Sequence, residues 1–448
     1  MRRPNVICLV IDRLHAGYLG AYGNTWTSTP ALDRFAAESF VFDQAIIDSP
    51  QLDLIYRSLW LGLHALCPQT CELYRDSLPT IFSNNGWHTA LLTDETVVAR
   101  HPLAAAFSEQ VLIQASGQSE QGRTSRQVAA MVDDTDAAMF FTSAKKWLEA
   151  AKSPFLLWLH TGTLGRAWDA PLEFRQQFAD EDDPAPSNSA NIPHRILSKD
   201  YDPDELLEAS HAYAGQISLV DQMVESLLEI VDGLGHADNT ELVIFSPRGI
   251  SLGEHRWLGI YDEDTYAEVI HVPWMARIPA NICASGRSQQ LIQPADWYAT
   301  ILDSCGLEYG ATTLDQARRP VGKLALTGYG RSFLPLIRGQ QSTGFDRACC
   351  LGSSGQTFIT PAWSLHLASD NLPKPRDISE KPTDNQAPQR VELFVKPDDW
   401  FEVNEVSNRC TGTVEKMRGA MVEFMNACQT SKPALLANLP DELIDGSE

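Results

Sequence analysis

Residues 3–46 read RPNVICLVIDRLHAGYLGAYGNTWTSTPALDRFAAESFVFDQAI, and this stretch opens with an apolar run that stops at two charged residues. Val6–Ile11 is apolar throughout rather than alternating, which is typical of a strand buried on both faces of a parallel sheet. Thr29-Pro30 predicts the start of a helix, because a capping residue precedes proline at the first helical position. The opening of the chain therefore predicts a strand followed by a helix.

Three further apolar runs have the same character as the first, and helical patterns lie between them. The clearest helical pattern covers His211–Leu234, where apolar residues form one stripe and Gly235 follows as a stop signal. We therefore expect an α/β fold, with a mostly parallel central sheet and helices on both of its faces. The further runs are Thr89–Leu92, Phe155–Leu159 and Leu242–Phe245.

The C-terminal part of the chain follows a different pattern. Strand-like runs return within residues 344–367 and 391–395 without a helix between them, which predicts a small α+β subdomain with an antiparallel sheet. Val414–Cys428 is an amphipathic helical pattern, and we expect the last ten residues to be mobile. Residues 180–204 are rich in Asp, Pro, Ser and Asn and predict an exposed insertion. The expected parts are an α/β domain over 1–340, a small subdomain over 341–412, and a helix with its tail over 413–448.

The composition narrows the classes of partner. The 448 residues carry a formal net charge of -23, which disfavours binding to the phosphates of nucleic acid. No apolar run reaches bilayer-spanning length, and the first is too short for the core of a signal peptide. The nine cysteines lack the spacing of a zinc site, which favours reduced thiols. We therefore expect a soluble cytoplasmic protein that binds neither nucleic acid nor membrane, and its oligomeric state is not predicted.

Polar residues follow each of the four predicted strands. The carboxyl ends of parallel strands meet at one edge of a sheet, which is where such folds bind ligands. A phosphatase with an Asp-x-Asp motif is disfavoured, because Leu14 occupies the second carboxylate position, and no glycine-rich phosphate loop follows any strand. The residues expected at this edge are Asp12-Arg13, Thr93-Asp94, His160 and Ser246-Pro247-Arg248.

Two long stretches resemble the sulfatase family, a branch of the alkaline-phosphatase superfamily. They are residues 3–46 and residues 211–255, HAYAGQISLVDQMVESLLEIVDGLGHADNTELVIFSPRGISLGEH. Shorter stretches resemble further landmarks of the family in the same order: LPTIFSNNGWHTALL, PADWYATILDSCGL, GRSFLPLIRG and VELFVKPDDW. The resemblance covers nearly the whole chain and implies the fold predicted above.

The resemblance also implies a calcium-dependent hydrolase of sulfuric esters, but this chain departs from the family at most of the implied site. Active members bind calcium through acidic residues at strand ends, since hard oxygen ligands suit a hard cation that polarises the ester. Asp12 is retained from that ligand set as a vestige. The departures are Arg13 at the paired acid, Pro247-Arg248 at Asp-His or Asp-Asn, Thr163-Leu164-Gly165 at Asp-Pro-His, and Asp94-Glu95-Thr96 at Lys-x-His.

The family's nucleophile is a cysteine, oxidised to formylglycine, or a serine, within Cys/Ser-x-Pro/Ala-x-Arg. The corresponding segment here is SPQLDLIYRSLWLG, residues 49–62. An ungapped match puts Leu52 at the nucleophile and Tyr56 at the arginine, while a slip of one residue puts Asp53 and Arg57 there. Cys71 has the motif's spacing to an arginine but lacks its Pro or Ala, so we interpret it as a chance match.

Three hypotheses follow for the function. The leading one is a pseudoenzyme, a non-catalytic sulfatase homologue that binds an anion or acts as a scaffold, with no cofactor expected. The second is a working sulfuric- or phosphoric-ester hydrolase with a non-standard site made of Asp12, Asp53, Arg57 and His255, which would use calcium. The third is a structural subunit of an oligomer. His15 and His160 are interpreted as packed histidines rather than catalytic ones.

Arg13 and Arg248 are the candidate anion-binding residues, because both should lie where the family holds its metal, beside Asp12. Either they pair with Asp12, Asp53 or Asp94 and serve as internal struts, or one guanidinium remains available to bind a sulfated or phosphorylated small molecule or glycan. The sequence leaves both alternatives open.

Overall fold

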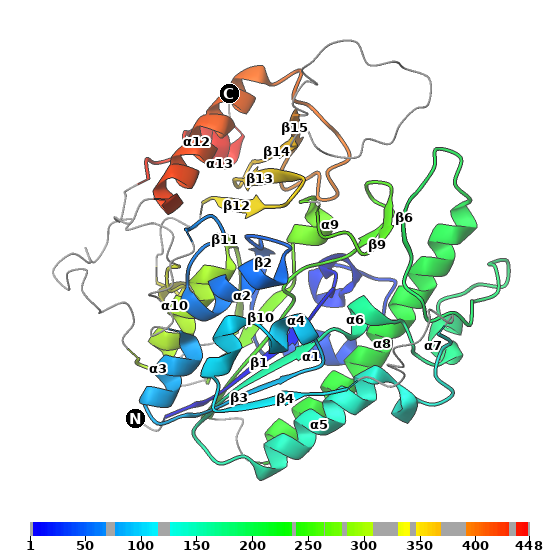
Figure 1. Ribbon diagram of the computed structural model, residues 1–448. Coiled ribbons are helices and arrows are strands. Elements are labelled where there is room, and N and C mark those ends of the chain that lie inside the picture. Colours follow the sequence, from blue (N-terminus) through cyan, green and yellow to red (C-terminus); the bar gives the residue numbers. More distant parts are fainter. Residues whose placement is uncertain are drawn as a thin grey trace.

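The structure is a computed structural model that describes residues 3–68, 77–114, 126–234, 239–263, 265–279, 285–307, 330–340, 346–368, 391–429 and 436–446. Its centre is an eight-stranded sheet in the order β11-β2-β10-β7-β1-β5-β3-β4 (Figure 1). In this sheet β10 is antiparallel to both of its neighbours, and the other pairs are parallel. The strands are β1 (Asn5–Ile11), β2 (Phe40–Ala45), β3 (His88–Thr93), β4 (Glu109–Leu112), β5 (Phe155–Thr161), β7 (Thr240–Phe245), β10 (Trp274–Arg277) and β11 (Gly286–Ile292).

Helices cover both faces of this sheet, as the sequence predicts. Successive residues of β1 belong to different apolar clusters: Cys8 lies in one cluster and Leu9 in the other. A strand buried on both faces has no polar side, which explains the unbroken apolar run in the sequence. Helices α2 (Leu52–Leu61), α3 (Leu78–Asn84) and α10 (Pro294–Ser304) contribute to the first cluster, and α1 (Pro30–Ala37), α5 (Asp136–Ala150) and α8 (Pro203–Gly233) contribute to the second.

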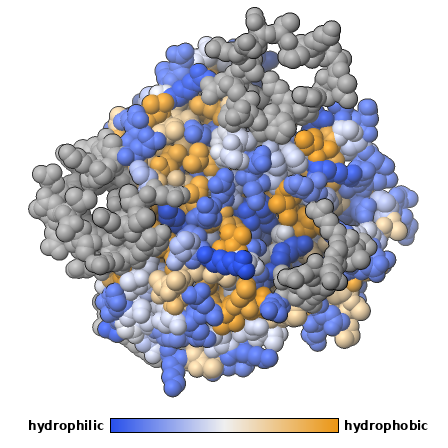
Figure 2. All heavy atoms as spheres, in the orientation of Figure 1, coloured by the Kyte–Doolittle hydropathy of each residue, from blue (hydrophilic) through white to orange (hydrophobic). Residues whose placement is uncertain are grey.

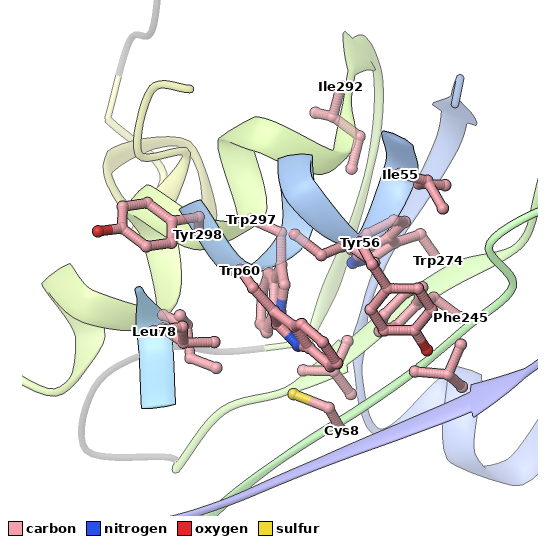
Figure 3. Packing of buried hydrophobic residues seen from close by; sticks show 14 of the residues in the cluster. Cys8, Ile55, Tyr56, Trp60, Leu78, Phe245, Trp274, Ile292, Trp297 and Tyr298 are labelled. Carbon is pink, nitrogen blue, oxygen red and sulfur yellow. The ribbon is translucent and has the colours of Figure 1, made fainter. Parts of the chain in front are cut away.

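Aromatic side chains fix α2 on the sheet (Figure 3). Tyr56 and Trp60 lie one turn apart on the buried side of α2, with ring centroids separated by 4.5 Å. Beneath them, Phe245 of β7 stacks on Trp274 of β10 at 4.1 Å. Each fully buried aromatic side chain contributes roughly 1.5–3 kcal/mol to stability. This packing holds the start of α2 at the carboxyl edge of the sheet.

Helix α8 begins eight residues earlier than the apolar stripe predicts. Asp202 accepts a hydrogen bond from the amide of Asp204 at 3.1 Å, and Pro203 occupies the first helical position. The first turn, with Pro203 and Asp204 exposed, is mostly polar, and the apolar residues that follow it are too few to show a stripe. Helix α1 begins at Pro30, as the sequence predicts, but its capping contact differs from expectation. Thr29 makes no capping hydrogen bond there, and Asp221 of α8 accepts from the first-turn amides instead.

The insertion at residues 180–204 is mostly exposed, as expected, but it also contributes one strand. β6 (His194–Ile196) pairs with β9 (Trp257–Gly259), which pairs with β8 (Ser251–Leu252). Both strand pairings are antiparallel, and the segment that leaves β9 leads to Tyr261 and Asp262. This small sheet therefore positions residues 260–263, which return to the edge of the central sheet.

The C-terminal part forms the small antiparallel sheet that the sequence predicts. Its order is β12-β13-β14-β15, and α12 packs against it (Figure 1). The expectation of a mobile end is wrong for residues 441–445, which form helix α13 with Leu443 buried in the apolar cluster of this sheet. The domain boundaries themselves stay a prediction. The elements are β12 (Ala348–Leu351), β13 (Gly355–Ile359), β14 (Trp363–Ala368), β15 (Val391–Val395), α12 (Thr411–Gln429) and α13 (Asp441–Asp445).

The surface in Figure 2 mixes hydrophilic residues with separate groups of apolar ones. Within the described ranges, no helix is both long enough and apolar enough to cross a bilayer. No disulfide joins two of the cysteines in the described part of the chain. The cytoplasmic location and the reduced state of all thiols stay predictions.

Candidate functional site

The four strands predicted from apolar runs are adjacent in the sheet, in the order β7-β1-β5-β3, and all run in the same direction. Val10 pairs with Phe245 on one side and with His160 on the other, so the residues that follow the strands emerge at one edge. The predicted gathering of polar residues at this edge is therefore present in the structure.

Arg248 and Asp12 form a two-point ion pair at this edge. Arg248 donates from Nε to Oδ1 and from Nη2 to Oδ2 of Asp12, each at 2.9 Å. Both side chains are almost completely buried. Burial by itself would raise the pKa of Asp12, but the positive charges of Arg248 and Arg13 outweigh it and lower the pKa to about 2. Asp12 is therefore ionised and holds Arg248 with both of its oxygens.

Asp262 joins the second arginine to this pair. Its Oδ2 accepts from Nη1 of Arg248 at 2.8 Å, and its Oδ1 forms an ion pair with Nη2 of Arg13. Arg13 also donates from Nη1 to the carbonyl of Gly249 at 3.2 Å. The cluster of Asp12, Arg13, Arg248 and Asp262, called the arginine–aspartate cluster below, balances two positive charges with two negative ones.

Arg13 is held in place by its backbone as well as by its charge. Its φ of 69° lies in the left-handed region, which residues other than glycine rarely adopt. Its amide donates to the carbonyl of Arg248 at 2.9 Å, and its carbonyl accepts from the Tyr213 hydroxyl at 2.5 Å. A Cβ added to Gly165 would lie 3.0 Å from Cγ of Arg13, so glycine at that position makes room for the arginine. Gly165 lies in α6 (Thr163–Arg166).

Asp94 lies at the same edge but pairs with neither of the candidate arginines. Its carboxylate forms an ion pair with Arg166 at 2.5 Å and accepts from Thr161 Oγ1 at 3.0 Å and from the amide of Gly162 at 2.7 Å. Burial raises its pKa to about 6, against the lowering effect of Arg166. Of the three acids offered as alternative partners of the two arginines, Asp12 is the one that Arg248 takes, whereas Asp94 pairs with Arg166, which the sequence analysis did not name.

Asp53 and Arg57 in α2 do not join the arginine–aspartate cluster. Asp53 is exposed. Its main-chain carbonyl accepts a hydrogen bond from His101 at 3.1 Å. Arg57 donates to the carbonyls of His64 at 2.9 Å and Cys67 at 2.6 Å, so it braces the turn that follows α2. Asp53, another of the alternative acids, is therefore not the partner of Arg13 or Arg248 in the described structure.

The start of α2 nevertheless reaches the cluster through its backbone. The carbonyl of Pro50, two residues before the helix, accepts from Nη1 of Arg248 at 3.1 Å. Leu52, the first residue of the helix, is buried. The segment that corresponds to the family's nucleophile therefore touches the arginine–aspartate cluster. The alternative motif that begins at Cys71 lies outside the described residues.

His255 belongs to a different network, between the central sheet and the C-terminal sheet. Its Nδ1 hydrogen-bonds to Glu268 at 2.8 Å and its Nε2 to the carbonyl of Glu402 at 3.2 Å. Its ring stacks on Tyr266 with centroids 3.7 Å apart. Burial acts to lower its pKa, but Glu268 raises it to about 9. His255 is therefore a charged structural contact.

The two histidines interpreted as packed are both buried. His160 Nδ1 hydrogen-bonds to the Tyr56 hydroxyl at 2.5 Å, and burial lowers its pKa to about 4, so the ring is neutral near pH 7. His15 accepts from the amide of Gly17 at 2.8 Å. The four residues of the hydrolase hypothesis, Asp12, Asp53, Arg57 and His255, are joined by no hydrogen bond or ion pair in the described structure.

Asp262 is the member of the cluster that the sequence analysis missed. It follows no predicted strand and belongs to no quoted motif. Two arginines beside one aspartate leave a positive charge to be balanced, and that imbalance was the available signal. The sequence offered Asp53 and Asp94 for this role because both lie nearer to recognisable landmarks.

The family resemblance implies a calcium ion at this edge, which would need several oxygen ligands close together. Among the described residues, no group of three or more His, Cys, Asp or Glu side chains is arranged to hold a metal ion. Both oxygens of the retained Asp12 are used by Arg248. The residues present therefore do not fit a calcium ion in the described structure.

Comparison with known proteins agrees with the observed architecture. Residues 4–307 match the family model named Sulfatase. An arylsulfatase of Clostridium perfringens is 21% identical in an alignment of 367 positions that covers 67% of this chain and 74% of that protein. The phosphonate monoester hydrolase of Agrobacterium radiobacter superimposes with a TM-score of 0.71 at 16% identity, covering 97% of this chain and 100% of that one.

A second solved structure, of a protein in complex with its substrate D-glucosamine-2-N,6-O-disulfate, has a TM-score of 0.70 at 16% identity and covers 96% of this chain and 99% of that one. At such identities the structural likeness concerns the fold alone. The family model covers more than half of the chain, in the region that contains the central sheet and the arginine–aspartate cluster. The chain belongs to the sulfatase family.

Proposed function

We propose that this sulfatase homologue does not hydrolyse esters. Arg13 and Arg248 instead play the structural role that a bound metal ion has in the family. The observation that carries the proposal is the two-point pair of Arg248 with Asp12, with Arg13 held beside it through Asp262. A guanidinium neutralises a carboxylate and donates paired hydrogen bonds to its oxygens, much as a metal cation neutralises a carboxylate by coordinating them. It cannot polarise a bound ester as a divalent metal does.

The residues that differ from the family pattern at this site fit one another in space and in charge. Gly165, at the position of the family's histidine, leaves the space that Arg13 fills, since any Cβ there would crowd the Arg13 side chain. Arg248 in turn uses both oxygens of Asp12. A divalent cation added here would meet two fixed positive charges. Coupled changes of this kind favour a site rebuilt for another use over a site damaged at one point.

The region of the nucleophile supports the same proposal. The start of α2 offers Leu52, which is buried, and Asp53, whose side chain is exposed. Neither supplies the thiol or hydroxyl that the family's chemistry requires. Arg57, the arginine of the shifted match, is engaged with main-chain carbonyls.

The proposed role is non-covalent binding of an anionic molecule in the cytoplasm, with a sulfated or phosphorylated sugar or small molecule as the ligand class. The solved relative with a disulfated glucosamine as its substrate makes a sulfated glycan a reasonable first candidate. The high net negative charge of the chain disfavours long polyanions, because they would be repelled by most of the surface.

Turnover and metal content test this proposal together. Purified protein is assayed with 4-nitrophenyl sulfate, 4-nitrophenyl phosphate and bis(4-nitrophenyl) phosphate, with added calcium and with chelator, beside an Asp12→Asn control. We expect no turnover above the control, no stoichiometric divalent metal by elemental analysis, and the same melting temperature with and without chelator. Asp53→Cys alone should restore nothing, because nucleophile, metal and proton-transfer groups act as a unit. Chelator-sensitive turnover that disappears in Asp12→Asn would establish the hydrolase hypothesis instead.

A further inference from the structure

The carboxylate of Asp262 bridges two buried guanidinium groups, with one oxygen on each. Oδ1 pairs with Arg13 and Oδ2 accepts from Arg248 at 2.8 Å. Paired donors from two arginines are the arrangement with which proteins bind the oxygens of sulfate, phosphate or carboxylate. Asp262 thus sits where the oxygens of an external anion would make the same contacts.

Solvent access separates Asp262 from the rest of the cluster. Its side chain is 38% exposed, compared with 2% for Arg13, 10% for Arg248 and 3% for Asp12. Asp12 is tied at both oxygens within the interior. Asp262 is therefore the carboxylate of this cluster that can leave by rotating its own side chain toward water.

Arg13 depends on Asp262 more than Arg248 does. Its ion pair with Asp262 is complemented by one hydrogen bond, to the carbonyl of Gly249, and its Nε has no partner among the described residues. Arg248 keeps Asp12 whether or not Asp262 is present. Withdrawal of Asp262 would leave two buried guanidinium groups beside one carboxylate, Asp12, so one positive charge would be unbalanced, which favours replacement of Asp262 by an anion.

We propose that Asp262 is an internal occupant of an anion-binding site formed by Arg13 and Arg248, and that the tetrahedral oxyanion of a sulfate or phosphate monoester displaces it. The inference rests on the proposed non-catalytic function and adds the residue that competes with the ligand. The anion binds without any covalent step, and the carboxylate that it displaces turns to solvent. Because Asp262 competes for the same two arginines, only an oxyanion that interacts with them more strongly binds at this site.

The loop that carries Asp262 is suited to side-chain rotation without wider movement. Tyr261 stacks on Trp257 with centroids 3.8 Å apart, and the carbonyl of Glu263 accepts from the amide of Ser354 at 3.3 Å. The residues on either side of Asp262 are therefore anchored to their surroundings. Exchange of its carboxylate for an anion needs no rearrangement of the loop.

Removal of the carboxylate tests the proposal. Wild type, Asp262→Asn and the matched control Asp43→Asn are titrated with inorganic sulfate and inorganic phosphate by calorimetry at constant ionic strength. Asp43 is a suitable control because it pairs with one arginine, Arg287, at 2.6 Å, away from the cluster. Asp262→Asn should bind sulfate or phosphate about tenfold to a hundredfold more tightly than wild type, since the anion no longer competes with a charge-assisted contact. Asp43→Asn should match wild type, and Arg13→Met added to Asp262→Asn should abolish the gain.

Each alternative outcome is decisive. Equal affinity in wild type and Asp262→Asn, or a gain that survives Arg13→Met, would overturn the proposal. If Asp262→Asn folds only when sulfate or phosphate is present, the anion replaces the carboxylate and the proposal stands. If it folds in neither salt, Asp262 is an indispensable strut and the proposal is wrong. The turnover assay, run on the same samples, separates this result from a failure of the non-catalytic function.

Discussion

Replacing Arg248 by methionine should be strongly destabilising at neutral pH. The change removes the guanidinium but keeps most of the apolar stem, so the loss reflects charge and hydrogen bonding more than volume. It leaves Asp12 buried without its two hydrogen bonds at 2.9 Å, and it leaves Asp262 with Arg13 as its partner. The variant therefore isolates the contribution of the arginine that meets the vestigial metal ligand.

The size of the effect follows from the burial of the pair. Removing one partner of a buried, hydrogen-bonded ion pair typically costs about 3–5 kcal/mol, because the other charge is left uncompensated. The total stability of a folded domain is typically about 5–15 kcal/mol, so the variant should lose a large part of it. A double variant, Asp12→Asn with Arg248→Met, carries no orphaned charge. It should be more stable than Arg248→Met alone, although it contains one change more.

The pH dependence adds an independent check. Arg248 and Arg13 hold the pKa of Asp12 at about 2 in the folded protein, below its unfolded value of about 3.9. A depressed pKa contributes stability that is present above the unfolded value and is lost as the pH falls through the folded one. The difference between wild type and Arg248→Met should therefore be largest at neutral pH and should narrow as the solution is acidified below about pH 4.

Urea unfolding followed by tryptophan fluorescence, at neutral and acidic pH, measures these free energies. Arg34→Met is the matched control, because Arg34 forms an exposed ion pair with Glu225 at 2.6 Å and such pairs contribute about 0–1 kcal/mol. The reasoning fails if Arg248→Met costs no more than Arg34→Met. It also fails if the double variant is no more stable than Arg248→Met.

Three further expectations concern the scaffold around the site. The difference in unfolding free energy between wild type and His255→Gln should be largest below about pH 6.5 and should shrink as the pH rises through about 9. The reason is that Glu268 raises the pKa of His255 in the folded protein to about 9. Urea titrations between about pH 6 and 10 measure this difference. Gly249→Ala should be severely destabilising, since the added Cβ would lie 2.0 Å from a carbonyl oxygen. Gly419→Ala, in the open middle of α12, should instead stabilise the protein by about 0.5–1 kcal/mol. Thermal melting compares the two variants, and equal effects would contradict the packing described. Asp221→Ala should cost about 1–2 kcal/mol in urea unfolding, because Asp221 caps the first turn of α1, and an unchanged midpoint would show that this cap contributes nothing.

The sequence by itself determined the central sheet and the edge at which the site lies. Val6–Ile11 is apolar at every position because β1 is buried on both faces, with Cys8 and Leu9 in opposite clusters. A strand of that kind must lie inside a sheet covered by helices, and its carboxyl end must meet those of its parallel neighbours. Asp12, Arg13 and Arg248 were therefore predictable as neighbours from local patterns and family landmarks alone.

The first and last residues of some helices were less predictable, because contacts outside the apolar pattern determine them. The apolar stripe of α8 was predicted from about His211, but the helix begins at Pro203, where the Asp202 side chain accepts a hydrogen bond from the amide of Asp204. Residues 441–445 are too short a segment to show a helical pattern, yet they form α13, and Leu443 enters a cluster built by distant strands. A local sequence pattern cannot predict a contact whose other partner lies far away in the chain.

Only the tertiary structure decided which charges pair. Asp53 and Asp94 are adjacent to landmarks in the sequence, but one points to solvent and the other is held by Arg166. Asp262 reaches Arg13 because β9 and its small sheet turn the chain back across the edge, bringing together residues 249 positions apart. A buried charge selects its partner by distance and desolvation rather than by sequence separation, and those quantities exist only once the sheet, α2 and the returning loop are packed together.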